Sequence, residues 1–283
     1  FGKNALTNAG TVLGDVGADY SVAIGEDAMG TGTTTTAIHN TVVGYKALED
    51  IQSGDGNVAL GSYAGADLTT GLSNVAIGAY DGATASAMRL GTTVQRCVVI
   101  GTGAGAAAMT GDGTTDATTA DGTVAVGYAS LAANTDGIGN TAVGYESLDA
   151  VTDADYNTAV GYQSLSGVTV SGASSNTAVG FHSGVAVSSG ISNTVIGASA
   201  LSTATTALKN VAVGGLAMQD VKAAVAVDGC VAIGYLALKG NSSNTTGING
   251  TVAIGSSALT ALTTGAGNVA VGYLAGNDLV EGG

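Results

Sequence analysis

The sequence contains no proline and no tryptophan, and aromatic residues make up only 4% of its 283 positions. The lack of proline fits an array of paired strands, in which backbone N–H groups are needed as donors. Lys and Arg are also scarce, 7 against 21 Asp and Glu, which gives a net charge of −14. A surface with so little positive charge argues against nucleic-acid binding. No apolar run approaches the roughly 20 residues that span a bilayer, so we expect no membrane insertion.

Glycine is abundant, and fifteen glycines end a five-residue pattern that recurs along the chain. In most copies the pattern reads Asn, Thr or Ser, then Thr or Val, then Ala or Val, then an aliphatic residue, then glycine. Seven of the fourteen intervals between these repeat glycines are 17 residues, and several others are 19–26. The repeat glycines are Gly14, Gly25, Gly44, Gly61, Gly78, Gly101, Gly127, Gly144, Gly161, Gly180, Gly197, Gly214, Gly234, Gly255 and Gly272. A period of this size is typical of stacked repeats. We therefore predict an all-β solenoid of about 15 rungs, forming one continuous array over residues 1–283.

Each repeat reads as a strand, a glycine bend, a second short strand (for example 144–148 and 161–165) and a variable polar loop. The residues three before and one before the repeat glycine share one face of an extended strand, and we expect them to line the interior. The residue between them is Ala in eleven repeats and Val in four, and would then face outward. A row of small apolar residues is unusual on a solvated strand face. We expect identical chains to cover that row, and this predicts a homotrimer.

The position four before the repeat glycine is Asn in nine repeats. Stacked side-chain amides can bond from rung to rung, so we predict an Asn ladder. Cys97 and Cys230 occupy the same position in two other repeats. Their separation along the array puts the sulfurs beyond disulfide reach, and we interpret each as a small buried thiol. The repeat glycine is expected to adopt a conformation that other residues avoid, or to allow close backbone approach.

These repeats resemble those of two groups of proteins. Residues 21–28 (SVAIGEDA) are similar to the head repeat of trimeric autotransporter adhesins, and residues 140–148 (NTAVGYESL) and 157–165 (NTAVGYQSL) resemble the repeats of phage tail-fibre proteins. The resemblance covers essentially the whole chain and implies a left-handed parallel β-roll that is three chains wide. In such phage fibres the shaft is often followed by a self-cleaving chaperone domain. The sequence departs from both groups by lacking a coiled-coil stalk, a membrane-anchor barrel and a recognisable chaperone or receptor-binding tip. Its longer period favours the tail-fibre group.

Variation in repeat length is concentrated in insertion loops near 83–95 and 106–122. Binding surfaces are commonly built on such loops, so a cell-surface glycan or receptor is one expected class of partner. Residues 1–6 read as the tail of an earlier repeat, and the chain ends in mid-pattern. We therefore interpret the sequence as a piece of a longer protein, with end-to-end stacking as a second mode of self-association.

No residues form a recognisable catalytic, cofactor-binding or metal-binding pattern, and we predict none of these sites. His39 and His182 lack the spacing of metal ligands and are expected in surface loops. Asp112, Asp116 and Asp121 share one glycine-rich insertion but lack the spacing of a calcium loop. The tyrosines that directly follow a repeat glycine could stack on sugars, or they could pack on adjacent loops with the hydroxyl exposed. They are Tyr45, Tyr128, Tyr145, Tyr162, Tyr235 and Tyr273.

The sequence thus predicts a structural or attachment protein rather than an enzyme: a stiff trimeric shaft of an extracellular or virion appendage, such as a phage tail fibre. A bacterial surface adhesin or filament subunit is the alternative with the same architecture. Two remote alternatives are an ice-binding solenoid and an enzyme acting on polysaccharide. Ice binding needs Thr at two same-face positions in each rung, and here Thr occupies only one strand position. The enzyme needs grouped carboxylates, often with Arg, and Arg89 and Arg96 are the only arginines.

Overall fold

The computed structural model describes residues 2–5, 20–30, 37–80, 93–107, 109, 120–169, 172–221, 227–241 and 246–282. The chain divides into two compact units, Phe1–Val143 and Gly144–Gly283, and each is considered by itself. Strands and turns make up the regular structure, and the described residues include no helix. The predicted all-β class is therefore confirmed. The repeat at Gly14 and most of the insertion loops near 83–95 and 106–122 lie outside the described residues.

Each repeat glycine from Gly25 onward is directly preceded by a three-residue strand. The first unit contains β1 (Val22–Ile24), β2 (Thr41–Val43), β3 (Val58–Leu60), β4 (Val75–Ile77), β5 (Val98–Ile100), β6 (Val124–Val126) and β7 (Thr141–Val143). The second contains β8 (Thr158–Val160), β9 (Thr177–Val179), β10 (Thr194–Ile196), β11 (Val211–Val213), β12 (Val231–Ile233), β13 (Val252–Ile254) and β14 (Val269–Val271).

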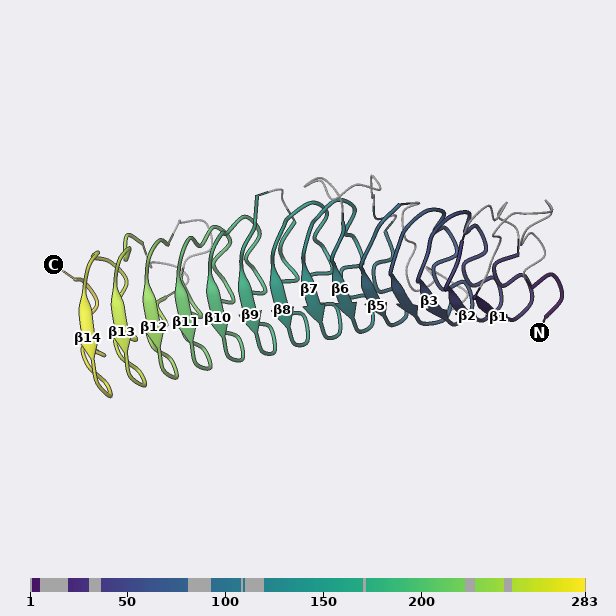
Figure 1. Ribbon diagram of the computed structural model, residues 1–283. Helices are drawn as coiled ribbons and strands as arrows, with labels where there is room; N and C mark the ends of the chain where they lie inside the picture. Colours follow the sequence, from purple (N-terminus) through teal and green to yellow (C-terminus); the bar gives the residue numbers. More distant parts are fainter. Residues whose placement is uncertain are drawn as a thin grey trace. The chain divides into compact units, whose positions relative to one another are not determined.

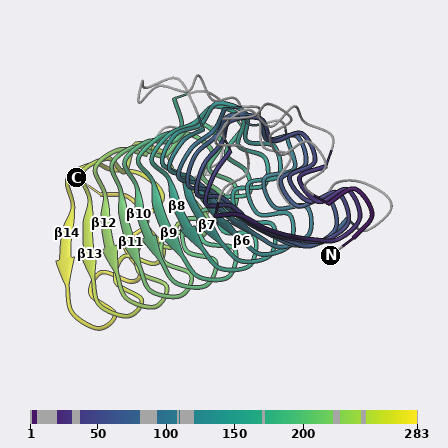
Figure 2. The same ribbon diagram turned by 45° about the vertical axis from the view of Figure 1, so that its right-hand side comes forward.

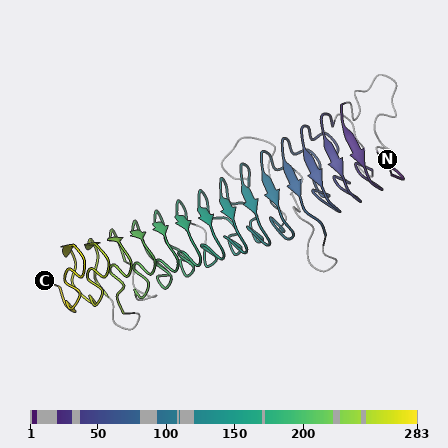
Figure 3. The same cartoon turned by 90° about the horizontal axis from the view of Figure 1, so that it is seen from below.

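Within each unit every strand pairs in parallel with the next strand along the chain (Figure 1). The register places equivalent residues opposite each other, as in Ala59 with Ala76. The arrows of one unit accordingly point the same way in Figure 3. Figure 2 shows coils of the second unit as loops with strands β8–β14 along one side. Each unit is thus a parallel β-solenoid with one strand per coil.

The second short strand expected after each repeat glycine is absent from the described coils, and this prediction was wrong. Residues 145–150 and 162–167 form turns instead. The residues two and four after a repeat glycine adopt left-handed backbone angles, as in Gln163 (φ 49°) and Leu165 (φ 52°). An extended strand cannot pass through that region of φ and ψ, so the chain turns there.

The repeat glycines have φ between +128° and +155°, a region that other residues rarely adopt. Their backbones also approach closely between coils. A Cβ added to Gly44 would overlap the carbonyl oxygen of Gly61 in the next coil. Both expectations for the repeat glycine are confirmed.

The direction in which the strand side chains point is the reverse of the prediction. The middle residue of each strand faces the interior and is buried from β1 to β13, with exposed fractions of 6% or less. The residues on either side of it face outward and are half-buried or exposed. A Cβ built on Gly65, four residues after a repeat glycine, would lie 3.7 Å from Ala76 Cβ and 2.9 Å from Leu48 Cδ2. The position four after a repeat glycine thus lies close to the middle residue of a strand across the coil, so the coil is narrow. Leucines of the turns, such as Leu48, fill the space beside the small middle residues.

The predicted Asn ladder is confirmed in both units. Asn57 Nδ2 donates to Asn40 Oδ1 (3.1 Å) and to the Gly71 carbonyl (2.9 Å). Asn57 Oδ1 accepts from both the backbone N–H and the side-chain amide of Asn74, at 2.9 and 3.0 Å. In the second unit the ladder joins Asn157, Asn176, Asn193 and Asn210 by the same bonds. Every rung of the ladder therefore ties a buried polar side chain to its neighbouring coils.

Candidate functional site: an exposed aliphatic strip

The outward side of the strands carries two parallel rows of side chains, which we call the aliphatic strip. In each unit it consists of the first and last residue of every strand, β1–β7 in the first unit and β8–β14 in the second. The first-residue row is Val22, Thr41, Val58, Val75, Val98, Val124, Thr141, Thr158, Thr177, Thr194, Val211, Val231, Val252 and Val269. The last-residue row is Ile24, Val43, Leu60, Ile77, Ile100, Val126, Val143, Val160, Val179, Ile196, Val213, Ile233, Ile254 and Val271.

The strip is uncharged and largely aliphatic, and much of it is open to solvent. Exposed fractions reach 49% at Val22, 46% at Ile24 and 41% at Ile196. In the last described coil Val269 and Val271 are 72% and 66% exposed. Seven rungs at about 4.8 Å make a strip about 30 Å long in each unit. A continuous apolar surface of this kind is typical of an interaction surface rather than of a solvated strand face.

Charged side chains lie in the turns and connections rather than on the strip. Lys46 Nζ and Glu49 Oε1 are 2.7 Å apart within one turn, and this bond raises the pKa of Lys46. Lys239 pairs with Asp220 at 3.0 Å. With 21 acidic residues in the chain, the remaining surface carries excess negative charge. Two copies approaching each other through those surfaces would repel each other, whereas approach through the strip would not bring charges together.

Aromatic side chains of the turns stack from coil to coil. The Tyr145 and Tyr162 rings are 5.0 Å apart and nearly parallel, at 5°, and Phe181 continues the stack at 5.6 Å from Tyr162. In the first unit Tyr63 lies between Tyr45 and Tyr80, at 5.3 and 5.4 Å. A hydrogen bond between the Tyr45 and Tyr63 hydroxyls favours the protonated form of Tyr45 and so raises its pKa. Sugar stacking needs a free ring face, and ring-to-ring stacking occupies faces that a sugar would use.

A row of polar side chains follows the second-unit stack. Gln163 Nε2 donates to Glu146 Oε2 (2.7 Å), and Gln163 Oε1 lies 2.8 Å from His182 Nε2. Next to Glu146, Asp149 Oδ1 is buried without a hydrogen-bond partner. Partial burial raises the pKa of Asp149, and the negative charge of Glu146 raises it further. This row contains one partly buried carboxyl group with an unbonded oxygen, but no arrangement of acid, base and nucleophile.

Two buried features of the core could be mistaken for chemical sites. Cys97 and Cys230 are both buried and free, which confirms their interpretation as buried thiols. Burial raises the pKa of Cys97 to about 12, and that of Cys230 is raised for the same reason. Thiols with raised pKa values are poor nucleophiles at neutral pH. The other feature, which our sequence analysis missed, is Asn134. It lies in the core, seven residues after a repeat glycine, and its Oδ1 has no partner.

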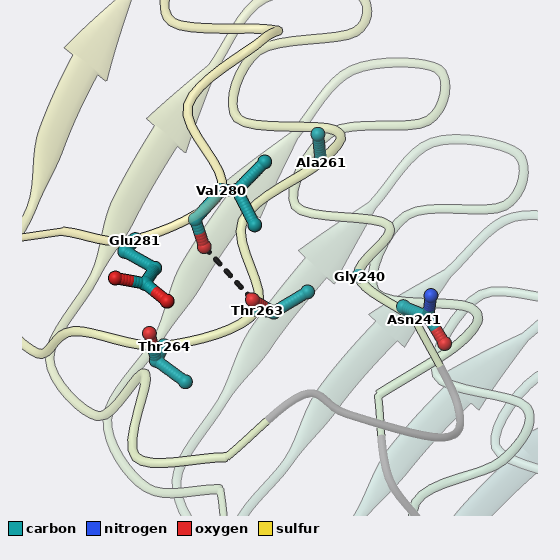
Figure 4. A pocket seen from close by; sticks show the side chains of 7 residues that line it. All are labelled: Gly240, Asn241, Ala261, Thr263, Thr264, Val280 and Glu281. Atoms are coloured by element: carbon teal, nitrogen blue, oxygen red, sulfur yellow. Dashed lines mark hydrogen bonds between the residues drawn. The ribbon is translucent and has the colours of Figure 1, made fainter.

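A pocket of about 550 Å³ opens in the second unit (Figure 4). Its walls are Gly240, Asn241, Ala261, Thr263, Thr264, Val280 and Glu281. The Thr263 hydroxyl is directed to the carbonyl oxygen of Val280, at 2.9 Å. Glu281 is the single charged residue among the seven, which include no His, Cys, Lys or Arg. The pocket therefore offers a small polar molecule little beyond one carboxylate.

The residues considered as metal ligands are dispersed. His39 is exposed and stacks on Tyr20 at 5.2 Å, and His182 is half-buried beside Gln163. Asp121 Oδ1 accepts the backbone N–H of Gln95, whereas Asp112 and Asp116 lie outside the described residues. Over the described ranges, no group of three or more His, Cys, Asp or Glu side chains is placed to hold a metal ion. Nor does the described part of the chain contain a helix long and apolar enough to cross a bilayer.

No protein-family model, curated protein or solved structure matches the chain. The strip is therefore interpreted from its own geometry.

Proposed function

We propose that this chain is a structural and attachment protein, a stiff homotrimeric shaft of an extracellular or virion appendage, with a phage tail fibre as the best-fitting example. The observation that carries the proposal is the uncharged aliphatic strip, to which every described strand contributes two outward side chains. The two partners of each chain are identical copies of itself.

The physical basis is burial of the strip. Covering the exposed part of a Val or Ile side chain stabilises the assembly by roughly 1 kcal/mol at the most exposed positions, and by less at the half-buried ones. The strip repeats with every rung, so the gain grows with the number of coils. A strip of two rows also suits self-association, because equivalent rungs of identical copies present the same side chains to one another.

The stiffness follows from the same rungs. Each coil is tied to the next by strand pairing and, in many rungs, by the buried Asn ladder. Coils that contact only their neighbours make a solenoid, and side loops can vary without interrupting it. We propose that a cell-surface glycan or receptor binds to such loops or to a tip beyond this sequence.

A pair of matched substitutions in one coil tests the proposal. Val43 lies on the strip and is 38% exposed, whereas Gln52 is exposed in the turn that follows the same strand. Val43→Glu would place like charges together where copies meet, and Gln52→Glu adds the same charge elsewhere. We expect sedimentation velocity to show a trimer for the unmodified protein and for Gln52→Glu, and dissociation for Val43→Glu. Equal masses for the two variants would contradict the proposal.

A further inference from the structure

The parallel stack of Tyr145 on Tyr162 has the geometry of a site for covalent modification. The two residues occupy the same position in successive coils, directly after Gly144 and Gly161. Their ring centroids are 5.0 Å apart with an angle of 5° between the planes. The two nearly parallel rings are therefore neighbours in adjacent coils. Both side chains are open to solvent, at 41% and 44% exposure.

The coil backbone and the neighbouring side chains hold this stack in register. The N–H of Gln163 donates to the carbonyl oxygen of Tyr145 at 2.9 Å. On the next position, Gln163 Nε2 donates to Glu146 Oε2 at 2.7 Å. These two hydrogen bonds, one from the backbone and one from the side chain of Gln163, hold adjacent coils together beside the two phenol rings. Such positioning converts an encounter between two phenols into a step within one molecule.

We propose that Tyr145 and Tyr162 form an oxidative cross-linking site, at which a carbon–carbon bond between the two rings joins adjacent coils covalently. A one-electron oxidant, such as a haem peroxidase supplied with hydrogen peroxide, removes one electron and one proton from each phenol. The two radicals couple through the ring carbons next to the hydroxyl-bearing carbons. The hydrogen on each coupled carbon then moves to oxygen and restores the phenol. In total the tyrosines lose two electrons and two protons, and one hydrogen peroxide takes them up to give two water molecules.

The other aromatic contacts supply internal comparisons. Phe181 stacks on Tyr162 at 5.6 Å and 22°, but it has no phenol and cannot enter this reaction. Tyr45 and Tyr63 are 5.3 Å apart with their planes at 85°, and Tyr63 and Tyr80 are 5.4 Å apart with their planes at 57°. Of these three tyrosine pairs, Tyr145–Tyr162 is the one with nearly parallel rings.

The test exposes the folded protein to a haem peroxidase and hydrogen peroxide and isolates the band that migrates as a single chain on a denaturing gel. This band excludes links between copies, so the result does not depend on the proposed trimer. Cleavage after acidic residues separates the two tyrosines, because Glu146, Asp149, Asp153 and Asp155 lie between them. Tandem mass spectrometry then locates the link. We expect a peptide pair joined through Tyr145 and Tyr162, reduced at least about ten-fold in Tyr162→Phe because the positioned partner is lost.

A second variant guards against a simple loss of folding. In Tyr145→Phe with Phe181→Tyr, the phenol pair moves one coil along the stack, and we expect the link to move to positions 162 and 181. Circular dichroism checks that both variants keep the fold. The proposal is overturned if N-acetyltyrosine couples under the same conditions while the single-chain band shows no link between 145 and 162. Links at other tyrosines alone, or links found only between chains, would overturn it equally.

Discussion

Buried asparagines in this solenoid differ in how completely they are hydrogen-bonded. Asn57 has a donor or acceptor partner for each part of its amide within the ladder. Asn134 Nδ2 donates to the Gly137 carbonyl at 3.1 Å, but its Oδ1 is buried without a partner. Equivalent positions in other coils are apolar and buried, as at Ile51, Val151 and Leu262. A buried asparagine therefore stabilises the fold in the ladder, four residues before the repeat glycine, and destabilises it at Asn134, seven residues after the repeat glycine.

We predict opposite effects for the same substitution at these two positions. Asn134→Leu removes a buried polar atom that has no partner, and is expected to raise the free energy of unfolding by about 1 kcal/mol or more. Asn57→Leu leaves the Gly71 carbonyl and the Asn74 amides without their partners, and is expected to lower it by about 3 kcal/mol. Urea denaturation of both variants measures the difference. Destabilisation by both would show that the Oδ1 of Asn134 is satisfied in solution.

The carboxyl of Asp149 predicts a pH-dependent effect. Its pKa is raised by partial burial and by Glu146, so the ionised form is less favourable in the folded protein than in the unfolded chain. At neutral pH the ionised carboxyl lowers the free energy of unfolding. This penalty disappears as the pH falls through the pKa of the folded protein, because the carboxyl is then protonated in both the folded and the unfolded state. Asp149→Asn should therefore raise the melting temperature at pH 7 and have a smaller effect at acid pH.

Thermal unfolding of Asp149→Asn between pH 3 and pH 7 measures this trend. Asp153→Asn removes the same charge from an exposed position nearby and controls for net charge. An effect of Asp149→Asn that does not depend on pH, or that grows toward acid pH, would contradict the assignment.

At the scale of one coil, the unusual feature is the number of left-handed residues that are not glycine. Thirty such residues in the described part have φ between +46° and +61°. They recur two and four residues after the repeat glycine and five before it, as in Ser199, Leu201 and Ser192. None of the thirty is Val, Ile or Thr, although these residues are frequent elsewhere in the chain. A β-branched side chain crowds the backbone in this conformation, which explains its exclusion.

Substitutions at Ser199 test this interpretation of the coil. Its φ is 52°, a conformation that costs about 1 kcal/mol for most residues and less for glycine. We expect Ser199→Val to be less stable than Ser199→Gly by about 2 kcal/mol, with Ser199→Ala between them. Calorimetric unfolding of the three variants gives the order. A valine variant as stable as the glycine variant would mean that the turn does not need a left-handed residue there.

The coil also shows how far the sequence could predict this fold. The period and the Asn ladder follow from spacing and residue type, and the parallel pairing was implied by the resemblance to known repeats; the structure confirms all three. Alternation shows which side chains share a face but not which face is inside, so Ala76 was assigned outward and Val75 and Ile77 inward. The correct choice depends on the leucines that fill the narrow coil from the turn. From Gly25 onward, no Val, Ile or Thr lies two or four residues after a repeat glycine, and this absence would have indicated turns in place of the expected second strand.

At the scale of the whole molecule, the reversed faces remove the reason for which a homotrimer was predicted, because the middle residues of the strands are buried within their own chain. The outward residues supply a different argument for self-association. Small buried alanines leave nothing for a second chain to cover, whereas the outward Val, Ile and Leu side chains of the strip do. The strip itself could not be predicted as the site, because our sequence analysis had placed its residues in the interior. The surrounding acidic surface disfavours other modes of contact between copies, so the strip is where they should meet.

The central claim is that sister chains cover the strip, and the mass of the unmodified protein in solution tests it most directly. Sedimentation equilibrium at micromolar concentration should give about three times the chain mass of 26.9 kDa. A single compact species of 26.9 kDa that persists as the concentration is raised would leave the strip facing water and would contradict the account.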